Sequence, residues 1–406
     1  MFGRLYATST RGSRVAAPPP APRRLSSPPD GGLRVVAWNL RCRAQPESGD
    51  GNHYPAVVLP GFHEGLEATT YPQWLPEPLE PVVARLARVD DCIGEMGDLS
   101  GRWSLDALEL VQLRRKDGHF RTVVSAIRPI PPVISLLFSE AINHLRAVLD
   151  NTVWYLVTEQ MGALDDQAAR AVAMPIYEES PKFAEWAKKI RTRVPALGQE
   201  TSAAHQRVKS LQPFANGARI ASVSATLAAM MDVEAEHVHP LLLLQAYSNL
   251  DKHRAIAVMV GRMMTNSAGL PMLAQDRSFR HMGVGTVLAE GSWGTPVPIE
   301  SSAAVMVERP APWAAAVSPA TETQLLHDWV RQEALPRLVT GSSEVATALP
   351  VTVELGDDGR TMGERITKPR RSSAQDRLDA INAQRFLEAM TKPVKFPAVV
   401  DQEFED

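Results

Sequence analysis

Two short polar clusters, each set within an apolar stretch, hold the residue types that could do chemistry in this chain. The first contains Asn143, Arg146 and Asp150, whose spacing would place all three on one face of a helix. The second is the run 249–254. Its histidine titrates near neutral pH and could act as a general acid or base, while arginine and lysine side chains bind phosphate. We therefore predict a catalytic set of His253, Arg146 and Asp150, and a ligand-binding set of Asn143, Asn249, Asp251, Lys252 and Arg254.

Two helices must position these clusters. Apolar residues at helical spacing predict a helix over 134–160, and a second helix is predicted over about 240–264. Polar groups midway along a buried helix cost free energy unless they are hydrogen-bonded. We therefore expect the two helices to pack antiparallel, with Arg146 and Asp150 near Asn249, Asp251 and His253.

The same residues also have a purely structural interpretation. Asp150 could pair with Lys252, Arg254 or His253, and Arg146 could pair with Asp251. Such a network would fix the register of the two helices without any catalysis. A chemical site, a structural network and a partner interface therefore remain alternatives at this point.

Length and composition narrow the class of protein. The 406 residues fit two or three domains, and 43 Lys plus Arg against 46 Asp plus Glu give a net charge of −3, which excludes a strongly basic or acidic protein. With only Cys42 and Cys92, a disulfide framework or Cys-rich zinc site is excluded, and reduced thiols in the cytoplasm are expected. No apolar run approaches the roughly 18 residues that a membrane helix requires. Neither a metal nor a cofactor is predicted.

The remaining patterns predict an α+β protein: a central helical bundle with an N-terminal β-hairpin and a small strand-rich C-terminal region. Residues 1–80 read as a Pro- and Arg-rich leader, expected to be disordered, with a transit peptide as the alternative. Residues 81–133 hold a helix and a hairpin, because Asp117-Gly118 between two apolar runs is a strong turn signal.

The rest of the chain follows in three parts. Residues 134–266 form the helical bundle, with further helices at about 181–192, 200–211 and 218–231. Residues 267–356 hold short strands and a helix at about 321–335, which should stop before Pro336. Residues 357–406 form a charged tail, expected to be disordered, in which Ala374–Met390 could form an amphipathic helix.

The two polar clusters resemble motifs of a bacterial family of largely uncharacterised proteins. Its members share an N-L-R-S-A-L-D-H helix, which 143–150 resembles, and an N-x-D-K-H-R helix, which 249–254 resembles. The similarity covers about residues 80–340. More distantly, the two helices resemble HEPN domains, the helical domains of many prokaryotic RNases. That resemblance implies RNA cleavage without metal, in which a histidine and an arginine at a dimer interface handle proton transfer and phosphate charge.

The chain departs from the HEPN pattern at one point. HEPN enzymes carry an arginine shortly before the histidine, whereas the corresponding positions here are Ala246, Tyr247 and Ser248. The guanidinium would have to come from Arg146 or Arg254 in space. The expected partners are RNA or another phosphate-bearing ligand and a second copy in a homodimer, with no membrane. The alternative is a non-catalytic scaffold or protein-interaction module.

Overall fold

The computed structural model describes the chain from Tyr71 onward, with gaps. All described residues belong to the compact unit Tyr54–Asp406. Leu75 and Leu79, the latter in a short 3-10 turn (Glu77–Leu79), are buried in the core. The end of the predicted leader, 71–80, is therefore part of the folded protein, and the rest of the leader lies outside the described residues. The structure describes 71–114, 118–231, 233–253, 256–267, 280–292, 299–353, 355–356, 372–391 and 398–400.

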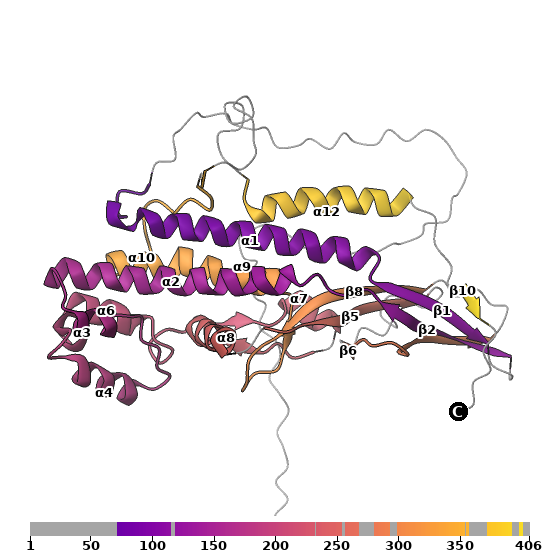
Figure 1. The fold of residues 1–406 in the computed structure, drawn as a ribbon, viewed down its shortest axis with the longest axis horizontal. Helices are drawn as coiled ribbons and strands as arrows, with labels where there is room; N and C mark the ends of the chain where they lie inside the picture. The colour runs from indigo at the N-terminus through magenta and orange to yellow at the C-terminus, as the bar shows by residue number, and fades with distance from the viewer. Residues whose placement is uncertain are drawn as a thin grey trace, which may run out of the picture. The chain divides into compact units, whose positions relative to one another are not determined.

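Two long helices, α1 (Glu80–Leu105) and α2 (Val133–Met161), pack against each other at the centre of the fold (Figure 1). The helix predicted over 134–160 is confirmed, and its apolar stripe is buried. Helix α1 extends to Leu105, and in its last turn Trp103 is buried and donates hydrogen bonds to main-chain oxygens before α2.

The predicted hairpin is present as β1 (Leu108–Arg114) and β2 (His119–Ile127). Gly118, with a φ of 81°, supplies the left-handed residue that such turns need. The hairpin is part of a larger sheet in the order β10-β1-β2-β7. Strand β7 (Val287–Ser292) pairs antiparallel with β2, and β10 (Ala398–Val400) pairs parallel with β1.

The prediction of one helix over 240–264 is wrong in its second half. Helix α8 (Pro240–His253) ends at the polar cluster, and 258–267 forms strand β5 (Val258–Ser267), so the helical bundle does not reach residue 266. A short apolar run such as 256–260 fits a buried strand as well as a helix. Pairing with β8 (Ile299–Glu308) decides between them, in a sheet ordered β6-β5-β8-β9 that includes β6 (Arg280–His281) and β9 (Ala316–Val317).

Shorter elements fill the segment between α2 and α8. The helices predicted near 181–192 and 200–211 are confirmed, but the one predicted over 218–231 begins only at Ala225. Its first residues instead form β3 (Ile220–Ala221), which pairs with β4 (His237–Val238). The helices of this segment are α3 (Asp166–Ala171), α4 (Ser180–Ile190), α5 (Pro195–Gly198), α6 (Ala203–Ser210) and α7 (Ala225–Met231).

The helical segment near residue 335 was predicted to stop before Pro336, but it continues past that residue. Helix α9 (Pro319–Trp329) continues through a π-helical turn (Val330–Ala334) into α10 (Leu335–Thr340). Pro336 lies in the first turn of α10, where a residue without an amide hydrogen is tolerated.

The predicted helix in the charged tail is confirmed as α12 (Ala374–Thr391), but that part of the tail is not disordered. It docks on α1, where Arg377 and Arg385 pair with Asp90 and Asp98. The protein is thus α+β, and side chains from α1, α2, α8, α9 and α10 share the main hydrophobic core. No helix within the described ranges is long and apolar enough to span a bilayer.

Candidate functional site

Arg146 and Asp150 bind each other and the chain beyond α3, instead of the predicted partners on α8. The Nη2 of Arg146 lies 3.2 Å from the Asp150 carboxylate and donates to the Met174 carbonyl at 2.6 Å. The same carboxylate accepts the Met174 amide at 2.8 Å. Together these bonds fasten the segment at Met174 to the middle of α2. The guanidinium expected to bind phosphate is therefore engaged by an internal carboxylate.

One contact of the predicted constellation does join α2 to α8. Asn143 Nδ2 donates to Asp251 Oδ2 at 2.8 Å. Deeper in the same interface, the rings of Phe138 and Tyr247 meet edge to face, with centroids 5.0 Å apart. The two motif helices are therefore neighbours, linked by an amide–carboxylate bond at the surface and an aromatic contact beneath it.

The other predicted site residues lie toward the C-terminal end of α8. Asn249 and Lys252 are exposed, and Asn249 lines a surface groove. His253 is the last residue of α8, and its side chain lies outside the described residues, as does Arg254. The role predicted for His253 therefore stays a prediction.

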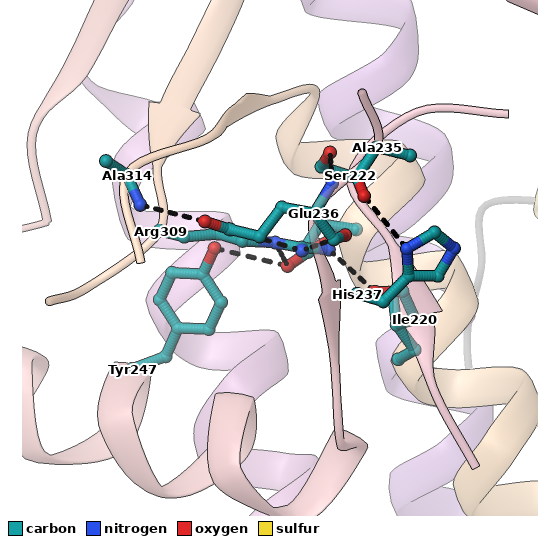
Figure 2. A network of polar contacts seen from close by, with 9 residues as sticks. Ile220, Ser222, Ala235, Glu236, His237, Tyr247, Arg309 and Ala314 are labelled. Carbon is teal, nitrogen blue, oxygen red and sulfur yellow. Dashed lines mark hydrogen bonds and ion pairs between the residues drawn. The ribbon is translucent and has the colours of Figure 1, made fainter. Parts of the chain in front are cut away.

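Sequence reasoning missed the most deeply buried ionic network of the described chain, which is centred on Arg309 (Figure 2). Arg309 follows β8 and holds the carboxylate of Glu322, on α9, through two hydrogen bonds of 2.9 Å. Both side chains are at most 1% exposed. Tyr247 of α8 donates to the same carboxylate at 3.3 Å. Little in the sequence indicates this network, because each of its residues lies in a different segment and none belongs to a recognisable motif.

Arg309 and Glu236 also fix the loop that follows β8. Arg309 donates to the carbonyls of Glu236 at 3.0 Å and Ile220 at 3.4 Å, near the two paired strands β3 and β4. The Glu236 carboxylate accepts the Ala314 amide at 3.2 Å, and the Arg309 amide donates to the Ala315 carbonyl at 3.0 Å. The loop 310–314 is thus held at both ends (Figure 2).

Burial governs the protonation of this network. Desolvation raises the pKa of the Glu322 carboxyl, an effect that the hydrogen bonds from Arg309 oppose. Desolvation alone would lower the pKa of Arg309, but its bonds to Glu322 raise it, so the guanidinium stays charged. Burial also raises the pKa of Tyr247, which therefore remains a hydrogen-bond donor at neutral pH. These groups are suited to holding structure and not to exchanging protons.

A groove of about 440 Å³ lies between α8 and this anchored loop. Seven of its ten lining residues are apolar, and its polar groups include the amides of Gln245 and Asn249 and the carboxylate of Glu178. Glu178 is the one acidic or basic side chain among the lining residues, so the groove contains no pairing of a nucleophile with a base. The lining residues are Glu178, Leu242, Gln245, Ala246, Asn249, Leu250 and 310–313.

No candidate metal site is present in the part of the chain that the structure describes. There, no group of three or more His, Cys, Asp or Glu side chains is arranged to hold a metal ion. Cys92 is a free thiol buried in α1, and burial raises its pKa to about 12. Cys42 lies outside the described residues.

Comparison with known proteins adds no relative from which a role could be transferred. No family model, curated protein or solved structure matches this chain.

Proposed function

We propose that this protein is a non-catalytic scaffold or protein-interaction module, in which the polar clusters hold the fold together. One observation carries the proposal: Arg146 is engaged by Asp150 at 3.2 Å and by the Met174 carbonyl at 2.6 Å. A guanidinium that binds a phosphate must offer its donors to the ligand. The Nη2 of Arg146 instead fastens one segment of the chain to α2, and its Nη1 is buried without a hydrogen-bond partner.

The groove beside α8 supports the same proposal. Its side chains offer apolar contact and amide hydrogen bonds, the two properties that binding surfaces combine. The loop that forms one wall is held at both ends by hydrogen bonds of the buried Arg309 network.

The decisive experiment compares folding and RNA cleavage side by side in the wild type and His253→Ala. A scaffold leaves a labelled RNA pool intact with both proteins, and the variant keeps its circular dichroism spectrum. Cleavage by the wild type that disappears in a folded His253→Ala protein would overturn the proposal. If the wild type cleaves RNA and a folded Arg146→Gln variant does not, that result would count against the proposal as well, because Arg146 would then act on substrate.

A second candidate is a HEPN-like protein that binds RNA or another phosphate-bearing ligand between α2 and α8. The observation that favours it is the Asn143–Asp251 hydrogen bond, which brings the two motif helices together next to the exposed Lys252. In that case Lys252→Glu should weaken RNA binding, and the binding should fall steeply with salt. Lys188→Glu, on the exposed face of α4, is the matched control. Membership of a HEPN-like bacterial family, a homodimeric state and a cytoplasmic location stay predictions.

A further inference from the structure

The groove between α8 and the loop 310–313 has walls of two different kinds. One wall is a stripe along α8, from Leu242 to Leu250, and the other is the loop itself. The Trp313 amide donates to the Pro310 carbonyl at 3.2 Å, which closes the loop into a turn. Pro312 is exposed on this turn, while Trp313 is half-buried and packs against the main core. An aromatic and prolyl wall therefore faces the helix.

Three lining side chains carry hydrogen-bond donors. Gln245 and Asn249 each offer a side-chain NH2 group, and Trp313 offers its indole N–H. Within the described ranges, none of these three side chains forms a hydrogen bond. A ligand that complements this groove therefore supplies acceptors.

A peptide in polyproline II conformation has the complementary backbone. This conformation has no internal hydrogen bonds, so its carbonyls are free to accept, and proline has no amide hydrogen that would need an acceptor. In an α-helical ligand most carbonyls are already bonded within the helix. Proline-rich segments in polyproline II conformation bind aromatic-lined grooves, and Trp313 with Pro310 and Pro312 forms such a wall.

The length of the groove sets the length of the bound segment. From Leu242 to Leu250, α8 advances by about 12 Å at 1.5 Å per residue. A polyproline II segment advances about 3.1 Å per residue, so about four of its residues cover the same distance. Gln245 and Asn249 lie one helical turn apart, about 6 Å along α8, and can therefore bind two carbonyls of one segment.

Glu178 gives the groove a preference for a basic ligand. Glu178 is exposed and is the one charged side chain among the lining residues. The nearby base Lys182 is bonded to Glu179 at 2.5 Å. Within the described chain, the Glu178 carboxylate has no ion-pair partner closer than 4 Å. An arginine or lysine beside the proline segment would supply that partner.

We propose that the groove binds a proline-rich peptide, about four residues long in polyproline II conformation, next to an arginine or lysine that pairs with Glu178. This inference rests on the proposed function, because it names the partner of a protein-interaction module. The two can fail separately: RNA cleavage is the result that overturns the module, whereas peptide binding tests the identity of its partner.

A fluorescein-labelled peptide of six prolines followed by two arginines tests the proposal on the full-length protein. Fluorescence anisotropy should give an affinity about ten-fold tighter than that of six alanines followed by two arginines, which has the same charge without the preformed conformation. Trp313→Ala should abolish binding, whereas Trp154→Ala, at an exposed tryptophan of α2 outside the groove, should not. Because Trp313 also packs on the core, the exposed position Asn249 provides a second variant. Loss of its donor in Asn249→Leu should weaken binding about three- to ten-fold.

A charge exchange tests the pairing with Glu178. Glu178→Lys should weaken binding of the arginine peptide and strengthen binding of a peptide with two glutamates in place of the arginines, by about five-fold in each case. Glu185→Lys, at an exposed position of α4 outside the groove lining, is the matched control and should change neither affinity.

Four results would each overturn the proposal. They are no binding of the proline peptide to the wild type, equal affinity for the proline and alanine peptides, unchanged affinity in Asn249→Leu, and the same charge preference in the wild type and Glu178→Lys. Tighter binding of an amphipathic leucine–lysine helix than of the proline peptide would assign the groove to a helical partner, and would overturn the proposal as well.

Discussion

Removing Arg309 should be among the most damaging single substitutions in the described chain. In Arg309→Met the Glu322 carboxylate loses both of its 2.9 Å bonds while staying at most 1% exposed, with Tyr247 as its remaining donor. Breaking a buried ion pair by deleting one partner costs about 3–5 kcal/mol. The carbonyls of Glu236 and Ile220 lose a donor as well, so we expect the upper part of that range.

Urea unfolding followed by circular dichroism measures this cost. The control is Arg88→Met: Arg88 binds Glu140 with the same two-pronged geometry, at 2.7 and 3.0 Å, but the two side chains are 38% and 37% exposed. An exposed pair is worth about 0–1 kcal/mol. Arg309→Met/Glu322→Leu removes both charges and should be clearly more stable than Arg309→Met alone. The reasoning is refuted if Arg309→Met costs no more than Arg88→Met, or if the double variant gains nothing.

Three further predictions concern single groups. Burial lowers the pKa of His239 from 6.5 to about 4. Between these two pH values the unfolded state binds a proton that the folded state does not, so the free energy of unfolding should fall by up to ~3 kcal/mol as the pH drops from 6.5 to 4. In urea titrations His239→Asn should lack this pH dependence. In a Cys42→Ser protein, the remaining thiol, Cys92, has its pKa raised to about 12 and is buried, so Ellman's reagent should react only after denaturant is added. Arg146→Lys, which removes the Nη2 that contacts both Asp150 and Met174, should lower stability by about 1–2 kcal/mol and speed proteolysis near residue 174.

Patterns that act locally were predictable from the sequence. The hairpin followed from Asp117-Gly118, and the helices over 134–160 and 374–390 followed from apolar spacing, because turn chemistry and helix periodicity are decided by near neighbours. The exchange of helix for strand after His253 was not predictable in the same way. Residues 258–267 pair with 299–307, and this distant partner decides their conformation.

The contacts of the candidate site were likewise predictable only in part. The contact between the two motif helices was anticipated, and Asn143–Asp251 makes it. The partners of Arg146 and Asp150 were not, because Met174 reaches them through its main chain, whose hydrogen-bonding groups are the same for almost any residue type. The Arg309–Glu322 pair likewise joins a loop to a helix, and neither sequence segment signals the other.

The first sheet has a consequence for how the chain is made. The residues of β1 and β2 are synthesised well before those of their outer neighbours β7 and β10, which lie near 290 and 400. Until those arrive, both flanks of the hairpin have unpaired amides and carbonyls, a template for unwanted pairing with other chains. Residues up to about 400 must therefore be synthesised before these strands acquire their final neighbours, and a nascent chain halted before residue 398 would leave one flank open.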